Sequence, residues 1–226
     1  MKKTKWSAAI CYADLARLAE QVSVLSEAAC DEFHVDITDG IFMPGFSLGA
    51  DTIRSLKSVS KLPIHAHLMA QNPERHIADI VMAGATHVSI HVESTPHVNR
   101  AMSLIKELGA QAGIAINPAS PLIKLEYVLN QADVVHMVAE ARGAERKVPL
   151  PATFDRVKIL RDNLNYLESR AELVVEGYMT PKNAASAIAH GADRIVWDDA
   201  AVFAPGHLVD NIDRFKEQVE HELQLA

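Results

Sequence analysis

Cysteine is scarce in this sequence. Only Cys11 and Cys30 occur among its 226 residues. Two cysteines cannot build a disulfide framework, and a chain with so few suits a reducing compartment. We expect both to be buried, unpaired thiols.

Long hydrophobic runs are also missing. No stretch of about 18 apolar residues occurs, so no membrane-spanning helix is expected. Near the amino terminus, lysines precede a short apolar stretch as in a secretory signal, but Asp14 interrupts it and the next residues continue with helical spacing. The expected location is therefore the cytoplasm, without a membrane partner.

Basic residues are fewer than acidic ones. Lysine and arginine number 22 against 29 aspartates and glutamates, which gives a net charge of −7. No basic stripe interleaved with aromatic residues is present, so a nucleic-acid partner is not expected. The hydrophobic fraction of 49% is enough for a sizeable core, and a small-molecule ligand remains compatible with these numbers.

The sequence does contain a regular alternation of short β-rich runs and amphipathic helical stretches. Eight strands with seven intervening helices and a final helix is the count of a (β/α)₈ TIM barrel, an α/β fold. No linker or low-complexity segment interrupts the pattern, so residues 1–226 are predicted to form a single domain. A doubly wound open sheet is the structural alternative. The eight runs are WSAAIC, FHVDI, PIHAHLM, HVSIHVE, AGIAIN, VVHMV, LVVEG and RIVWD.

Ionisable side chains share one face of three of these predicted strands. Because successive side chains on a strand point to opposite faces, the apolar set packs under the helices and the polar set points into the barrel. A barrel interior is normally apolar, so buried polar groups there require a partner. His65 and His87 are interpreted as hydrogen-bonded core residues. The polar set is His34, Asp36 and Thr38, then His65, His67 and Met69, then His87, Ser89, His91 and Glu93.

Four of the ligand-type residues predict a metal site. His34 and Asp36 lie on one strand and His67 on its neighbour, about 4.8 Å away. Glu176, at the end of LVVEG, would come from the opposite wall and complete the set. Two imidazoles and carboxylates suit one divalent ion, zinc first, with iron, manganese and cobalt as alternatives.

A cation flanked by two carboxylates suits proton transfer at carbon. A substrate that chelates the metal through a carbonyl and a neighbouring hydroxyl oxygen becomes more acidic at the intervening carbon. With Asp36 and Glu176 as the acid/base pair, one carboxylate removes the proton and the other returns one to the opposite face. The stereocentre then inverts.

These segments resemble the ribulose-phosphate 3-epimerase family. The strings HVDITDG and HLMAQNPE, together with ADLARLAEQV, GATHVSIHVES and GIAINPASPL, carry the resemblance in order along nearly the whole chain. It implies a (β/α)₈ barrel, a divalent metal, a homo-oligomer, and inversion of C3 of a ketose phosphate. By position, His34, Asp36 and His67 look like three metal ligands, and Met69 looks like a methionine that lines the enediolate.

The chain also departs from the family pattern. Glu176 replaces the aspartate of the family's VDGG, which keeps a carboxylate but lengthens it by one methylene. The family's first-strand serine aligns with Ala9, although Ser7 shares its face. An ungapped count puts Val138 at the sixth-strand methionine, with Met137 one place earlier. The candidate substrate contacts in the strands are Ser7, Met69, Asn117, Met137 and Gly177.

The predicted phosphate site differs most. The family's glycine-rich segments after strands six to eight present N–H groups to the phosphate. Here Asp198 and Asp199 stand where it would sit, and each like-charge contact costs on the order of 4 kcal/mol at an intermediate dielectric. Either they cap the following helix, or one of them contacts a substrate hydroxyl or amine. Arg142 either restores an anion site from the loop 139–149 or belongs to an ordinary solvated loop.

The sequence thus predicts a metal-dependent epimerase acting on a ketose or ketose phosphate, with ribulose 5-phosphate a poor substrate. One alternative is an aldose–ketose isomerase or a lyase that uses the same enediolate. Another is a paralogue that binds a ligand without catalysis, although the carboxylate retained at Glu176 argues against it.

Overall fold

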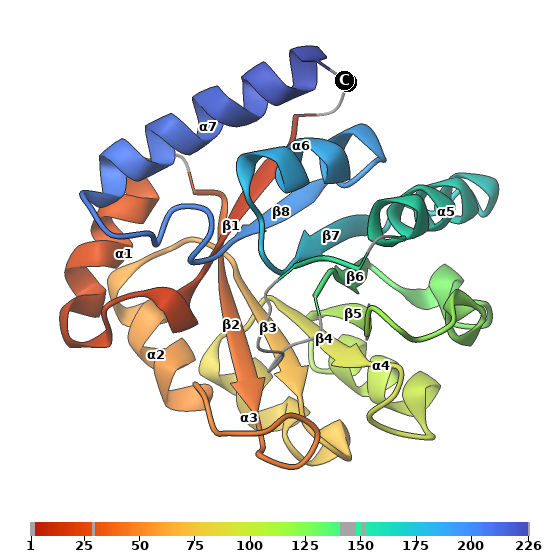
Figure 1. Ribbon diagram of the computed structural model, residues 1–226. Helices are drawn as coiled ribbons and strands as arrows, with labels where there is room; N and C mark the ends of the chain where they lie inside the picture. Colours follow the sequence, from red (N-terminus) through yellow and green to blue (C-terminus); the bar gives the residue numbers. More distant parts are fainter. Residues whose placement is uncertain (1–2, 29, 141–147, 151, 226) are drawn as a thin grey trace.

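Eight parallel strands close into a barrel in the computed structural model of the chain, which describes residues 3–28, 30–140, 148–150 and 152–225 (Figure 1). The first strand pairs with both the second and the eighth, so the (β/α)₈ prediction is confirmed and the open-sheet alternative is wrong. Each of the eight β-rich runs became a strand. The strands are β1 (Lys5–Ala9), β2 (Glu32–Thr38), β3 (Ile64–Met69), β4 (His87–His91), β5 (Gln111–Ile116), β6 (Val134–Val138), β7 (Glu172–Glu176) and β8 (Arg194–Trp197).

Helices surround the strands, and α7 lies beside α1 where the ring closes (Figure 1). None of the helices in the described part of the chain combines the length and apolar character needed to cross a bilayer. The α-helices are α1 (Leu18–Glu27), α2 (Ala50–Val59), α3 (Ile77–Ala83), α4 (Val98–Glu107), α5 (Thr153–Tyr166), α6 (Pro181–Ala189) and α7 (Leu208–Leu225). Short 3₁₀ segments occur at Ile10–Tyr12, Leu15–Arg17, Pro73–Arg75, Leu122–Leu125 and Leu129–Gln131.

One connection differs from the expected pattern. Between β5 and β6 the structure has two 3₁₀ segments in place of an α-helix. Pro118 and Pro121 supply no backbone N–H and disfavour helical geometry in the residues before them. Little sequence is then left before β6 for a full helix.

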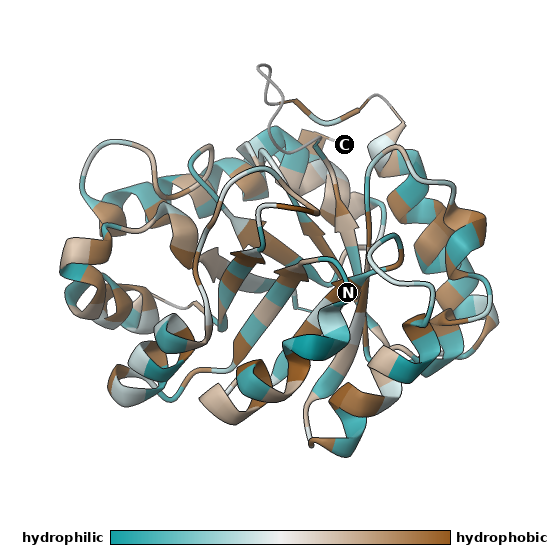
Figure 2. Cartoon of the chain, turned by 90° about the horizontal axis from the view of Figure 1, so that it is seen from below, coloured by the Kyte–Doolittle hydropathy of each residue, from teal (hydrophilic) through white to brown (hydrophobic). Residues whose placement is uncertain are grey.

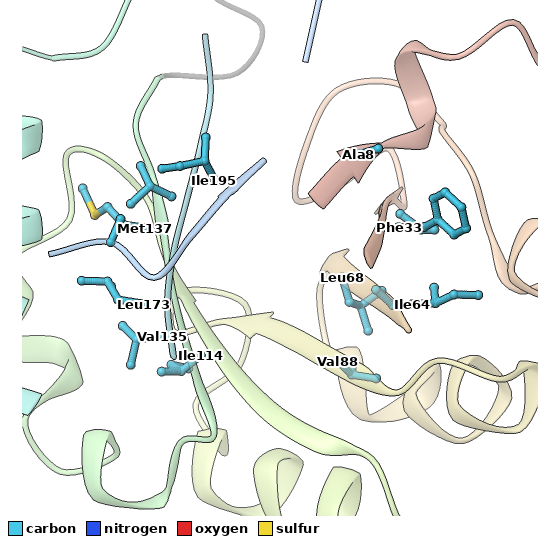
Figure 3. Packing of buried hydrophobic residues seen from close by; sticks show 14 of the residues in the cluster. Ala8, Phe33, Ile64, Leu68, Val88, Ile114, Val135, Met137, Leu173 and Ile195 are labelled. Atoms are coloured by element: carbon cyan, nitrogen blue, oxygen red, sulfur yellow. The ribbon is translucent and has the colours of Figure 1, made fainter. Parts of the chain in front are cut away.

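The main core lies between the outer face of the sheet and the helices. Hydrophilic and hydrophobic residues alternate along the helices (Figure 2), whose apolar stripes cover the barrel. Phe33, Leu68 and Ile114 project from their strands into this layer and are fully buried (Figure 3). The alternation expected for β2 and β3 is therefore confirmed, because the partner residues of these strands face inward.

The amino-terminal end of the barrel interior holds a buried ionic cluster. Arg194 Nη1 donates to Glu32 Oε2 at 2.5 Å, and its Nη2 donates to Glu172 Oε2. Ser7 Oγ donates to Glu32 Oε1 at 2.8 Å. Glu32 and Arg194 are each 2% exposed. Burial alone would raise the pKa of Glu32. The nearby His65 and the Arg194 guanidinium lower it by more than burial raises it, so the pKa lies well below its usual range. Glu32 is therefore ionised and depends on its cationic partner.

Replacing this carboxylate tests the cluster. Glu32→Gln removes the buried charged partner of Arg194 and leaves only the Glu172 carboxylate, and we expect the free energy of unfolding to fall by about 3–5 kcal/mol. Urea unfolding at pH 7 measures it. Lys158→Ala is the control, because its pair with Asp162 is exposed on α5 and contributes less than about 0.5 kcal/mol. Equal stability of the Glu32→Gln and control variants would contradict the assignment.

Candidate active site

Five ionisable side chains meet inside the carboxyl-terminal half of the barrel. In a closed parallel barrel all strands end at the same mouth, so residues near different strand ends lie close together. β2, β3, β6 and β7 contribute these side chains. Each is at most 1% exposed, and they are His34, Asp36, His67, His136 and Glu176.

The two carboxylates lie between the imidazoles. His34 Nε2 is 2.9 Å from Glu176 Oε2 and 3.3 Å from Asp36 Oδ1. His67 Nδ1 is 3.1 Å from Asp36 Oδ1 and 3.2 Å from Glu176 Oε1. His136 Nε2 is 3.3 Å from Glu176 Oε2. The four residues predicted as ligands are thus together, with His136 added.

Several buried nitrogens here have no hydrogen-bond partner. Among the described residues, neither ring nitrogen of His34 or His136 is hydrogen-bonded. Buried polar atoms are normally satisfied, because an unpaired one loses its interactions with water. A divalent cation accepts imidazole lone pairs and compensates the buried carboxylates, so this donor set fits a metal site. One donor atom each from His34, His67, His136 and Glu176 lies within 4.8 Å of the others.

The pKa values show how strongly the carboxylates favour positive charge. Burial lowers the pKa of His34, but Asp36 and Glu176 raise it to about 9. The pKa of His67 is also raised, against the same burial effect, by the charges and hydrogen bonds of Glu176 and Asp36. Burial dominates at His136 and lowers its pKa to about 3. The carboxylates therefore favour positive charge between β2, β3 and β7, and His136 is a neutral imidazole.

A chain of hydrogen bonds fixes the orientation of His67. Its Nε2 lies 2.8 Å from His91 Nε2, and His91 Nδ1 lies 3.1 Å from Glu93 Oε2. The backbone N–H of Asn117 donates to Glu93 Oε1 at 3.0 Å. With its Nε2 held in this way, His67 presents Nδ1 to Asp36 and Glu176. Asn117 was expected to contact substrate, and its backbone N–H is already bonded to Glu93.

Two residues of the mouth contact or line this cluster. Cys11 Sγ donates to Asp36 Oδ2 at 3.2 Å, a contact that no sequence pattern indicates. Neither cysteine forms a disulfide, and only Cys30 is buried, since Cys11 is partly exposed. Met69 is buried at the end of β3, beside Thr38 in register, and does not belong to the apolar clusters. Its inward position agrees with the predicted place at the site.

Ser7 and Met137 lie away from the cluster. Ser7 is paired in register with Glu32, one inward position below Ala9 and His34, and belongs to the ionic cluster at the other end. Met137 packs in the outer core (Figure 3). Both placements correct the expected substrate contacts. The same period-two alternation identifies His136, which the sequence analysis missed, as the inward residue of β6 between Val134 and Val138.

The histidines interpreted as core residues have hydrogen-bond partners. His65 Nε2 is 2.7 Å from Ser89 Oγ, and His87 Nδ1 is 2.9 Å from Thr86 Oγ1. Asp39, in the same sequence string as His34 and Asp36, accepts backbone N–H bonds from Ile41 and Phe42 and organises the loop after β2. These residues support the site without joining it.

Asp198 binds the loops after β7 and β8. Its Oδ2 accepts from the Met179 N–H and its Oδ1 from the Ala200 N–H, each at 2.9 Å. Burial raises the pKa of Asp198 to about 6. Since α7 begins only at Leu208, the alternative in which Asp198 and Asp199 cap the following helix is wrong. Asp199 is half-buried next to this carboxylate.

Gly177 and Arg142 complete the residues expected near the phosphate position. Gly177 has φ +103°, and a Cβ there would lie 3.0 Å from the backbone nitrogen of Glu140. Its role in the structure is thus the close approach of the segments after β6 and β7. Arg142, with the adjacent basic residues of the loop, lies outside the described residues.

Comparison with known proteins places the sequence in one family. A model of the ribulose-phosphate 3 epimerase family matches residues 5–203. The chloroplastic ribulose-5-phosphate-3-epimerase of Arabidopsis thaliana is 35% identical over 93% of this chain and 75% of its own length. The ribulose-phosphate 3-epimerases of Synechocystis and Escherichia coli K12 are 32% and 31% identical, over 95% and 98% of this chain and 94% and 100% of their own lengths.

Solved structures agree on the fold. The 3-hexulose-6-phosphate synthase of Salmonella typhimurium has a TM-score of 0.73 at 13% identity, covering 97% of this chain and all of that one. A mutant tryptophan synthase α-subunit from Pyrococcus furiosus has a TM-score of 0.66 at 16% identity and is covered completely, as is this chain. At such identities these likenesses support the barrel alone. The sequence relatives carry the assignment: the chain belongs to the ribulose-phosphate 3-epimerase family and is an isomerase that epimerises carbohydrates.

Proposed function

We propose that the chain is a metal-dependent epimerase that inverts C3 of a ketose or ketose phosphate through an enediolate. The observation that carries this proposal is the pair of buried carboxylates, Asp36 and Glu176, which reach the same imidazoles from different strands. His67 Nδ1 lies 3.1 Å from one and 3.2 Å from the other. The names of the sequence relatives support the same reaction class.

His34, Asp36, His67 and Glu176 would hold one divalent cation, zinc first, with iron, manganese and cobalt as alternatives. The ring nitrogens of His34, which make no hydrogen bond, and the burial of the two carboxylates support this set. When bound, the cation would stabilise the negative charge that develops on the substrate oxygens.

The two carboxylates move the proton. Either Asp36 or Glu176 accepts the C3 proton of one epimer, and the protonated form of the other returns a proton to the opposite face. The carboxylate pair therefore exchanges roles when the reverse reaction runs. Both groups are at most 1% exposed, so bulk water has little access during the transfer. The Cys11 thiol, which donates to Asp36 Oδ2, helps orient one of these carboxylates.

The substrate end remote from C3 meets an internal carboxylate. Asp198 already accepts the N–H groups of Met179 and Ala200 in the loops after β7 and β8. An incoming phosphate would compete with this carboxylate for donors, and a like-charge contact costs on the order of 4 kcal/mol at an intermediate dielectric. We therefore propose that a ketose without a phosphate at this position is preferred, and that ribulose 5-phosphate is a poor substrate.

Removing either carboxylate tests the acid/base assignment. Asp36→Asn and Glu176→Gln should each lower kcat by about 10²–10⁴-fold, since each loses one general acid/base. Solvent deuterium entering C3, followed by NMR, measures the step directly and distinguishes epimerisation from aldose–ketose isomerisation or chain cleavage. Asp162→Asn, on the exposed face of α5, is the matched control. Undiminished C3 exchange in both site variants would refute the assignment.

Substrate preference tests the proposed end group. Turnover of ribulose 5-phosphate is compared with that of a panel of unphosphorylated ketoses at equal concentration. We expect a higher kcat/KM for at least one unphosphorylated ketose, because the loops hold a carboxylate against the phosphate. Efficient turnover of ribulose 5-phosphate alone would defeat this part of the proposal and leave the C3 chemistry intact.

The raised pKa of Asp198 gives a test by pH. Its pKa is about 6 in the folded chain against 3.8 for the ordinary group, so the folded state binds this proton more tightly. The stability relative to an Asp198→Asn variant should therefore fall as pH rises through the folded pKa. Urea unfolding of both proteins at pH 5 and pH 7.5 measures the difference. A difference that is constant or grows with pH would show that Asp198 is not a buried carboxylate of this kind.

A further inference from the structure

We infer that His136 is a further ligand of the cation, so that three imidazoles join the Asp36 and Glu176 carboxylates around it. This inference rests on the metal site of the proposed function and extends it. The observation is a convergence: the ring nitrogens of His34, His67 and His136 all lie around the Glu176 carboxylate.

The spacing of these atoms fits a single coordination shell. Zinc binds imidazole nitrogen and carboxylate oxygen at about 2.0–2.2 Å, so neighbouring ligand atoms around one zinc ion are about 3 Å apart. The Glu176 oxygens lie 2.9 Å from His34 Nε2, 3.2 Å from His67 Nδ1 and 3.3 Å from His136 Nε2. His136 thus stands at the same range from the shared carboxylate as the two histidines already assigned.

His136 lacks the partners of an ordinary buried histidine. His65, its neighbour at a ring-centroid distance of 5.4 Å, bonds Ser89 Oγ at 2.7 Å. In the described part of the chain, neither nitrogen of His136 is hydrogen-bonded, and its side chain is fully buried. The ring centroid of His67 is only 4.3 Å away. A cation beside the lone pair of His136 would satisfy a nitrogen that the protein leaves unsatisfied.

A third imidazole changes the character of the site. Nitrogen-rich donor sets bind zinc, cobalt and iron, whereas magnesium and calcium take oxygen ligands. His136 approaches from β6, while Asp36 approaches from β2 and contacts His34 and His67. The cation would therefore be drawn toward β6 and β7, with Asp36 at its β2 side.

X-ray absorption of the cobalt- or zinc-loaded protein counts the imidazoles directly. We expect three in the wild type and two in His136→Leu, which has a side chain of similar bulk without a donor. The variant should also bind the cation at least about 10-fold more weakly, as measured in competition with a chromophoric chelator. Loss of a residue that only holds a metal ligand in place already lowers the affinity by about 10–100-fold. Two imidazoles in the wild type would overturn the inference, and this measurement does not depend on whether the variant folds.

His65→Asn is the matched control. It removes an equally buried imidazole of the barrel interior that already has a hydrogen-bond partner, so it should retain three metal-bound imidazoles and the wild-type cation affinity. Loss of an imidazole in this variant would contradict the assignment of His136. Wild-type protein that binds one cation through two imidazoles removes only the role of His136. Wild-type protein that binds no cation removes this inference together with the metal dependence of the proposed function.

Discussion

Charge compensation inside a closed barrel is the constraint on which the site depends. Asp36 and Glu176 are ionisable groups in the interior, where an unpaired charge is strongly disfavoured. The buried carboxylates need a positive charge nearby, and the imidazole nitrogens that make no hydrogen bond need an electron-pair acceptor. A single bound cation would meet both needs. The hydrogen-bonded chain through His91 and Glu93 holds one of these imidazoles in place.

Much of the fold could be predicted because strand periodicity is a strong local signal. Alternation along FHVDIT and IHAHLM placed His34, Asp36 and His67 on the inward face, and neighbouring parallel strands then brought them together. The same rule accounts for His136. Alternation alone predicts which face a side chain is on but not its position along the barrel axis. Ser7 therefore shares a face with Ala9 but lies at the opposite end of the barrel interior. Met137 has the family's residue type but the wrong strand parity, whereas the ungapped count indicates Val138, which shares the face of His136.

The loops were less predictable because their contacts are nonlocal. Nothing in WDDAAVF indicates that Asp198 accepts a backbone N–H from Met179, nineteen residues earlier. The close approach of Gly177 to Glu140 likewise joins segments that follow different strands. Loop conformations depend on such partners more than on local preference, so helix capping was a reasonable expectation for Asp198 that the late start of α7 overturned.

The bond between Glu32 and Arg194 joins residues 162 positions apart in the sequence. It can form only when nearly the whole chain has been synthesised and the first and last strands lie together. A partial barrel made of the amino-terminal strands would bury Glu32 without its guanidinium partner, and so would be penalised relative to the closed one. The cluster at the amino-terminal end thus discriminates against incomplete assemblies and makes closure of the barrel a cooperative event.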